Sequence, residues 1–147
     1  MASQIRREPV LANFRPSVTE REREKRTRKS AAEKREGNSD AHLAAIRKTV
    51  CCGCGSAAPN DPHHLKHGPA KDERAFGRRA TDRWVIPLCR RCHDLAEEAG
   101  TRREEALFRG WGIDAIELAA ALAQAPNNPD VMTRIVQGHV GRGRRSR

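Results

Sequence analysis

The chain of 147 residues has no tyrosine, and its aromatic residues amount to only 3%. It also lacks any run approaching the roughly 18 consecutive apolar residues that a membrane-spanning helix needs. The short length and these scarcities exclude a large α/β enzyme with its own buried cofactor. The first residues lack the apolar run of a secretory signal, so we expect a cytoplasmic protein with no membrane partner.

Basic charge is what the sequence has in excess. Lysine and arginine number 29 against 19 acidic residues, a formal balance of +10. Such an excess makes polyanions the expected partners, with nucleic acid first. The excess is uneven, because residues 41–95 hold 10 basic and 5 acidic residues, whereas residues 96–137 hold 4 and 7. The basic part of the middle also holds every cysteine, so it is the most informative segment.

Composition divides the chain into four parts. Residues 1–40 are a charged, low-complexity tail that forms a solvated helix or stays disordered. Residues 41–125 hold the central domain with its C-terminal helices. Residues 126–137 form a short terminal helix that starts at a proline and ends at Gly138. Residues 138–147 read as a flexible basic tail.

Local signals place the elements of the central domain. Ser39 or Asp40 caps a helix over residues 41–48, and Asp114 caps another over 115–124. Thr101 and Glu104 have the spacing of a capping box. Together with the turn residues, these signals predict strands at 61–66 and 83–88, a loop at 67–81, and helices at 90–99 and 102–109.

Five cysteines lie in two groups: Cys51, Cys52 and Cys54, then Cys89 and Cys92. Two C-x-x-C pairs in a chain expected in the cytosol indicate metal binding and not disulfides. Two such turns aim four thiolates at one point about 2.3 Å away, which is the geometry of zinc. Cys52 is then a spare thiol, although it could displace Cys51 as a ligand.

A metal would compensate for a small core. Residues 50–95 contain few large apolar side chains, so a domain built on them is only marginally stable without a bound metal. Four thiolates leave no open coordination position. The predicted Zn²⁺ site is therefore structural and not catalytic.

The histidines suggest a second site. His63 and His64 are adjacent in a predicted strand, so they point to opposite faces. His93 begins a predicted helix, and Glu97 lies four residues on, on the same face, which makes a half-site for a divalent cation. One strand histidine would complete that site and leave the other free to act on water, with Asp82 as a further carboxylate nearby. The alternative is that these residues are surface polar groups or extra zinc ligands.

The chain resembles the HNH nuclease superfamily in three segments, Cys51-x-x-Cys54-Gly55, Asp61-Pro-His-His64 and Asp82-Arg-Trp-Val-Ile-Pro-Leu-Cys89-x-x-Cys92-His93. More narrowly, it is similar to phage and prophage HNH-type proteins related to recombination-enhancing nucleases. Residues 105–119 resemble the C-terminal helices of that group. The resemblance covers roughly residues 41–124 and leaves out both tails.

This resemblance implies a small α+β fold: a zinc-stapled ββα-metal, treble-clef-like core with flanking helices and charged tails. It also implies a metal-dependent endonuclease that hydrolyses phosphodiester bonds of DNA. By the family pattern, His64 is the general base, while His63 and His93 bind one catalytic ion that stabilises the leaving group. Mg²⁺ is the default ion, and Mn²⁺, Ni²⁺ or Zn²⁺ are alternatives.

Two departures from the family pattern matter. Many relatives carry a second histidine where this chain has Glu97, a carboxylate that can still bind a hard cation such as Mg²⁺ or Mn²⁺. The middle asparagine of the HNH pattern is replaced by Trp84. Asp82 is the nearest polar substitute, so we assign it to the catalytic group with His64.

Contact with DNA is expected from the basic residues of the middle: Lys66, Lys71, Arg74, Arg78, Arg79, Arg83, Arg90 and Arg91. Charge alone gives only salt-sensitive, non-specific binding, and a solvated basic face is the alternative. Two other functions stay open. One is a zinc-binding treble-clef module that binds nucleic acid with weak or lost catalysis. The other is an adaptor whose partners are phage recombination or packaging proteins.

Overall fold

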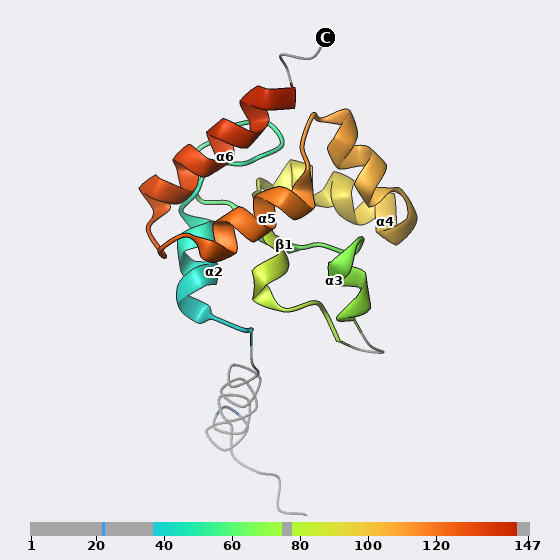
Figure 1. Cartoon of the computed structure of the whole chain (residues 1–147), viewed down its shortest axis with the longest axis horizontal. Coiled ribbons are helices and arrows are strands. Elements are labelled where there is room, and N and C mark those ends of the chain that lie inside the picture. The colour runs from blue at the N-terminus through green and yellow to red at the C-terminus, as the bar shows by residue number, and fades with distance from the viewer. Residues whose placement is uncertain (1–21, 23–36, 75–77, 144–147) are drawn as a thin grey trace, which may run out of the picture. The chain divides into compact units, whose positions relative to one another are not determined.

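The computed structural model describes residues 22, 37–74 and 78–143, with side chains as far as residue 140 (Figure 1). Arg35–Arg147 forms one compact unit, to which the following description applies. The predicted N-terminal tail, residues 1–40, lies almost entirely outside the described residues. The last four residues of the predicted basic tail, 144–147, lie outside them too.

The described elements follow one another as two strands, five α-helices and one 3₁₀ turn: α2 (Asp40–Arg47), β1 (Asp61–His64), α3 (Pro69–Asp72), η1 (Asp82–Trp84), β2 (Val85–Leu88), α4 (Arg90–Gly110), α5 (Ala115–Gln124) and α6 (Pro129–Gly143). The expected small α+β fold is confirmed. No helix within the described ranges combines the length and the apolar character needed to cross a membrane.

The strands form an antiparallel hairpin in which His63 pairs with Ile86 and His64 with Val85. Two prolines, Pro62 and Pro87, face each other in this register. Neither proline has a backbone N–H to donate, which limits the ladder between the strands. All four residues of β2 are buried, so the short hairpin is the centre of the core.

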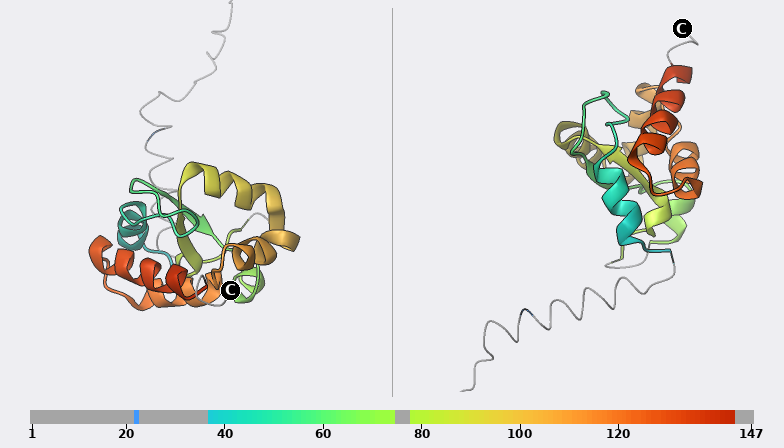
Figure 2. Two further views of the ribbon diagram at one scale, coloured as in Figure 1. Left: turned by 90° about the horizontal axis from the view of Figure 1, so that it is seen from above. Right: turned by 90° about the vertical axis from the view of Figure 1, so that its left-hand side faces the viewer.

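Helices cover the hairpin on both sides (Figure 2). The α4 helix packs against both strands, α5 packs against β2 and η1, and α2 packs against both strands. The core between them is apolar and includes Ile46, Ile86, Phe108, Leu118 and Leu122. Because the strands alternate, the face of β1 that carries His63 is turned toward α4, while His64 lies on the other face.

The predicted helix starts at α2 and α5 are confirmed. The Ser39 Oγ accepts a hydrogen bond of 3.2 Å from the His42 N–H, and the Asp114 side chain accepts one of 2.9 Å from the Glu117 N–H. Each cap satisfies a backbone donor that the first turn leaves free, a contribution of about 1 kcal/mol.

The two helices predicted at 90–99 and 102–109 form one element, α4, with a break at Gly100. Gly100 has φ 63° and ψ 177°, a conformation that is essentially restricted to glycine. The break turns the second half of α4 relative to the first. Residues on both sides of Gly100 can therefore face the same side chain of the hairpin.

Several predicted boundaries are wrong. The first strand ends at His64 and not at residue 66, and the second begins at Val85, because residues 82–84 form η1. The loop predicted at 67–81 contains α3, which begins at Pro69 after a positive-φ glycine. The terminal helix does not end at Gly138 but continues to Gly143. A glycine within a helix costs only about 1 kcal/mol relative to alanine. Burial of Val136 and packing of Val140, one turn apart, outweigh that cost.

Candidate functional site

Four cysteines meet beside the hairpin. Cys51 and Cys54 belong to the turn after α2, Cys89 stands immediately before α4, and Cys92 lies in its first turn. Their four sulfur atoms lie within 4.8 Å of one another, and the Sγ atoms of Cys54 and Cys89 are 3.5 Å apart. Tetrahedral Zn–S bonds of 2.3 Å place sulfur atoms about 3.8 Å apart. The cluster therefore has the donor set and the spacing of a structural zinc site.

The backbone of the first cysteine turn is adapted to this cluster. Gly55 has φ +78° and its N–H donates to the Cys51 carbonyl oxygen at 2.9 Å. A Cβ atom at Gly53 would lie 3.0 Å from the Cys92 sulfur, so a side chain there would press on the cluster. The Cys52 N–H donates to the Pro87 carbonyl oxygen at 3.0 Å and fixes the turn to β2.

Cys52 itself is fully buried and does not belong to the four-sulfur cluster. The alternative that Cys52 replaces Cys51 is thus not the arrangement in the structure. Burial raises the pKa of the Cys51, Cys52 and Cys92 thiols. The hydrogen bond with Ser56 lowers the pKa of the exposed Cys54 thiol to about 6.

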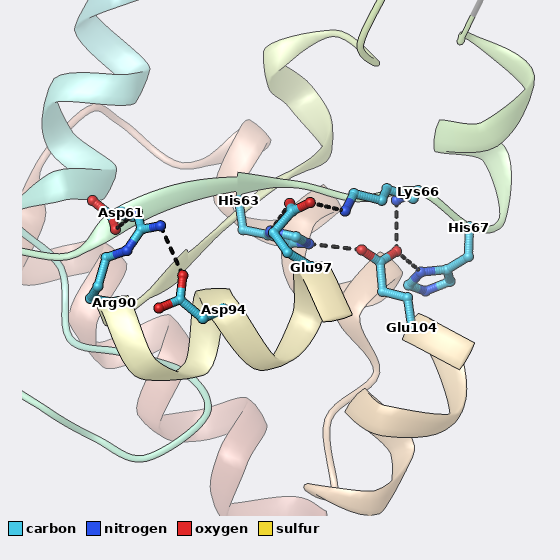
Figure 3. A network of polar contacts seen from close by, with 8 residues as sticks. All are labelled: Asp61, His63, Lys66, His67, Arg90, Asp94, Glu97 and Glu104. Atoms are coloured by element: carbon cyan, nitrogen blue, oxygen red, sulfur yellow. Dashed lines mark hydrogen bonds and ion pairs between the residues drawn. The ribbon is translucent and has the colours of Figure 1, made fainter. Parts of the chain in front are cut away.

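A second cluster joins β1 to α4 (Figure 3). His63, His93 and Glu97 place ligand atoms within 4.8 Å of one another, and the His63 Nδ1 is 3.6 Å from a Glu97 oxygen. The Nδ1 atoms of both histidines are buried and have no hydrogen-bond partner among the described residues. Buried polar atoms are rarely left unpaired. Two unpaired imidazole nitrogens beside a carboxylate fit a bound divalent cation.

Lys66 and Glu97 form an ion pair at the edge of this cluster. The Lys66 Nζ lies 2.5 Å from the Glu97 Oε2. The hydrogen bond from Lys66 is the main reason that the pKa of Glu97 lies below its usual value. The Glu97 side chain is 49% exposed, so it can turn between Lys66 and a cation.

His64 and Asp82 form a separate pair on the other side of β1. The His64 Nε2 and the Asp82 Oδ1 are 2.8 Å apart, and the Ser39 N–H donates to the Asp82 Oδ2, also at 2.8 Å. Burial acts to raise the pKa of Asp82, but the hydrogen bonds from His64 and Ser39 outweigh it and lower the pKa. An ionised carboxylate only accepts hydrogen bonds, so the His64 Nε2 carries a proton, and in the uncharged ring the lone pair is on Nδ1.

One hollow of about 260 Å³ connects the two groups. His64, His93 and Glu97 line it together with three basic residues, Lys66, Arg74 and Arg79. Of the residues predicted to contact DNA, Lys66, Arg74 and Arg79 therefore lie beside the histidines.

The other predicted DNA-contacting residues lie outside that hollow. Arg78 and Arg91 are exposed. Arg83 lies over the Trp84 ring, 4.7 Å from its centre. Arg90 is 73% exposed and forms ion pairs with Asp61 and Asp94 (Figure 3).

Two residues of the site escaped the sequence prediction, Glu104 and His67. Glu104 is fully buried. Its Oε1 is 2.7 Å from the His63 Nε2, and its Oε2 is 2.6 Å from the His67 Nδ1 and 2.7 Å from the Lys66 backbone nitrogen (Figure 3). Burial acts to raise the pKa of Glu104, but these hydrogen bonds lower it to about 2.

The predicted capping box of Thr101 and Glu104 is thus wrong, because the Glu104 side chain accepts hydrogen bonds from His63 and His67 instead. His67, which falls in the loop predicted at 67–81, is buried against it. One sequence signal points to Glu104. Glu104 and Phe108 are four residues apart, so the glutamate lies on the same helix face as an apolar residue of the core.

The described residues thus define a small α+β protein with a four-cysteine zinc-type site beside a histidine and carboxylate cluster. The family model described as "Protein of unknown function (DUF968)" matches residues 26–110, and the chain belongs to this family. The match includes all five cysteines and every residue of the two clusters, and it ends at the last residue of α4. No curated protein and no solved structure matched the chain.

Proposed function

We propose that this chain is a zinc-stabilised, metal-dependent DNA endonuclease of the HNH type. The observation that supports it most is the shared hollow. A histidine held by a buried carboxylate, candidate cation ligands and three basic side chains line one space of about 260 Å³. Hydrolysis of a phosphodiester needs these three components together: a base, a cation and positive charge to hold the phosphate.

In this proposal His64 is the general base. Asp82 holds the ring so that Nε2 carries the proton, and Nδ1 is free to accept one from a water molecule that attacks the phosphorus. The side chain of His64 is 12% exposed, which is compatible with contact to a water in the hollow. Asp82 thereby takes the orienting role of the asparagine of the family pattern.

His63, His93 and Glu97 would hold the catalytic cation. A mixed set of imidazole and carboxylate ligands suits Mg²⁺ or Mn²⁺, with Mn²⁺ better matched to two nitrogens. Such an ion supplies charge stabilisation for the leaving 3′ oxygen. The unpaired Nδ1 atoms of the two histidines support this assignment.

Lys66, Arg74 and Arg79 would hold the DNA backbone at the hollow. Contacts of this kind are not specific for base sequence, and they weaken steeply as salt rises. The four-cysteine site would act at a distance from the chemistry. It fastens the turn after α2 to the start of α4, as in a ββα-metal or treble-clef core.

Nicking of supercoiled plasmid DNA tests the proposal. The zinc-loaded protein is incubated with plasmid in Mg²⁺ or Mn²⁺ at 50 mM salt, beside His64→Ala and the matched control His139→Ala, which removes a histidine of α6. General-base catalysis contributes roughly 10²–10⁴-fold, so His64→Ala should lose that factor while the control keeps wild-type activity. If neither wild type nor His64→Ala nicks the plasmid in any metal while both bind DNA, the proposed nuclease activity is refuted.

One observation favours a second function, a nucleic-acid-binding module without effective catalysis. The Lys66–Glu97 ion pair occupies the carboxylate that a cation would need. If that pair persists in Mn²⁺ and the protein binds DNA without nicking it, this second function replaces the first. Failure to bind DNA at 50 mM salt would instead favour an adaptor for phage recombination or packaging proteins.

A further inference from the structure

Glu104 has an unusual position for a carboxylate. It is fully buried, and both of its oxygens accept hydrogen bonds from one short segment, residues 63–67. One of these donors, the Lys66 backbone N–H, can only donate a hydrogen bond. The other two are ring nitrogens of His63 and His67, whose protons can move to the opposite nitrogen.

The hydrogen bonds to Glu104 determine where those ring protons sit. An ionised carboxylate has no proton to donate, so His63 must carry its proton on Nε2 and His67 on Nδ1. The lone pair of an uncharged His63 ring is then on Nδ1. That atom is the buried, unpaired nitrogen that lies 3.6 Å from Glu97.

We infer that Glu104 is a positioning residue that sets the tautomer of His63 and so aims its Nδ1 lone pair at the candidate cation site. The inference rests on the cation site of the proposed function, and it concerns the ring of His63 rather than the hydrolytic step. Outer-shell carboxylates of this kind orient metal-binding histidines and change metal affinity by roughly ten- to a hundredfold.

The geometry gives Glu104→Gln an asymmetric effect. The amide carbonyl must face the Lys66 N–H, because that donor is fixed, and His67 donates to the same oxygen position. The amide NH₂ group then faces the His63 Nε2. His63 would have to move its proton to Nδ1 to accept this hydrogen bond, whereas His67 keeps its tautomer.

Long-range ¹H–¹⁵N correlation spectra of ¹⁵N-histidine-labelled, zinc-loaded full chain report the tautomer of each ring. In the wild type we expect an Nε2–H ring for His63 and an Nδ1–H ring for His67. In Glu104→Gln, His63 should change to Nδ1–H and His67 should not change. This pair of results separates positioning from a general loss of structure, which would affect both rings.

Calorimetric titration with Mn²⁺ supplies the second readout. The Kd for Mn²⁺ should rise roughly ten- to a hundredfold in Glu104→Gln and stay unchanged in Glu98→Gln, a matched control at an exposed position of α4. Unchanged zinc content and circular dichroism verify that each variant is folded. If Glu104→Gln does not fold, the wild-type spectrum still tests whether His63 carries its proton on Nε2.

A wild-type His63 with its proton on Nδ1, or on both nitrogens, overturns the inference. An unchanged Mn²⁺ affinity in a folded Glu104→Gln protein also overturns it. The nuclease proposal fails separately: expected tautomers and Mn²⁺ binding without plasmid nicking would leave the positioning role standing. Nicking that depends on His64 but not on Glu104 would leave the nuclease standing alone.

Discussion

Replacing Cys54 with serine separates metal binding from packing, because the Cys54 side chain is exposed. A serine at this position removes no buried apolar surface, and its hydroxyl can keep the contact with Ser56. A large loss of stability in Cys54→Ser must therefore come from the loss of a metal ligand. The buried Cys52 offers the opposite case, a thiol that packs in the core but lies outside the cluster.

The size of the expected effect follows from the four-sulfur geometry. Structural zinc sites contribute about 10–16 kcal/mol in small zinc-dependent peptides, which is about 2.5–4 kcal/mol for each of four thiolates. An ordinary surface substitution changes the free energy of unfolding by about 0.5 kcal/mol or less. At about 4 °C per kcal/mol for a domain of this size, Cys54→Ser should lower the Tm by about 10 °C or more.

Thermal unfolding followed by circular dichroism, with metal analysis of the dialysed protein, measures both quantities. Wild type should hold one zinc, and EDTA should remove most of its stability advantage over Cys54→Ser. The Cys52→Ser control should lose about 1–3 kcal/mol from burial of a hydroxyl yet keep its zinc. A Cys54→Ser protein that keeps one zinc and melts within about 3 °C of wild type would refute the cluster as a zinc site.

Three further changes have defined outcomes. Gly100→Ala forces a side chain into a conformation restricted to glycine and should lower the free energy of unfolding by about 1–3 kcal/mol in urea titrations. Asp82→Asn should reduce plasmid nicking roughly 10²–10⁴-fold, because the Ser39 N–H holds the carbonyl and turns the NH₂ group toward His64. Lys66→Met releases Glu97 from its ion pair, so calorimetry should show several-fold tighter Mn²⁺ binding.

For each of these three predictions, one experimental result would contradict the physical argument behind it. A Gly100→Ala protein as stable as wild type would mean that the break in α4 is not required for packing. Undiminished nicking by Asp82→Asn would remove Asp82 from the orientation of the base. Weaker Mn²⁺ binding by Lys66→Met would show that Lys66 supports the cation site instead of competing for it.

Features set by neighbouring residues were predictable from the sequence. In the caps at Ser39 and Asp114, the side chain accepts a hydrogen bond from the backbone N–H three residues later. Because this contact is local, the starts of α2 and α5 could be predicted. The spacing of the two C-x-x-C pairs likewise fixes where each pair of thiols points. The interval of four between His93 and Glu97 places both on one helix face.

The wrong predictions arose where distant residues decided between local alternatives. Thr101 and Glu104 satisfy the pattern of a capping box, yet the glutamate is taken by histidines about 40 positions earlier in the chain. Gly138 is a reasonable helix end by local signals, but the packing of Val140 against the core extends α6 beyond it.

The sequence by itself determined the two cysteine pairs of the zinc site and the paired histidines of the hairpin, because each depends on residue type and short spacing. The small α+β class was implied by the family resemblance. Only the tertiary structure decided that His63 meets Glu104 as well as Glu97. The physical reason is the break at Gly100, which turns the two halves of α4 so that Glu97 and Glu104 reach opposite nitrogens of one imidazole ring.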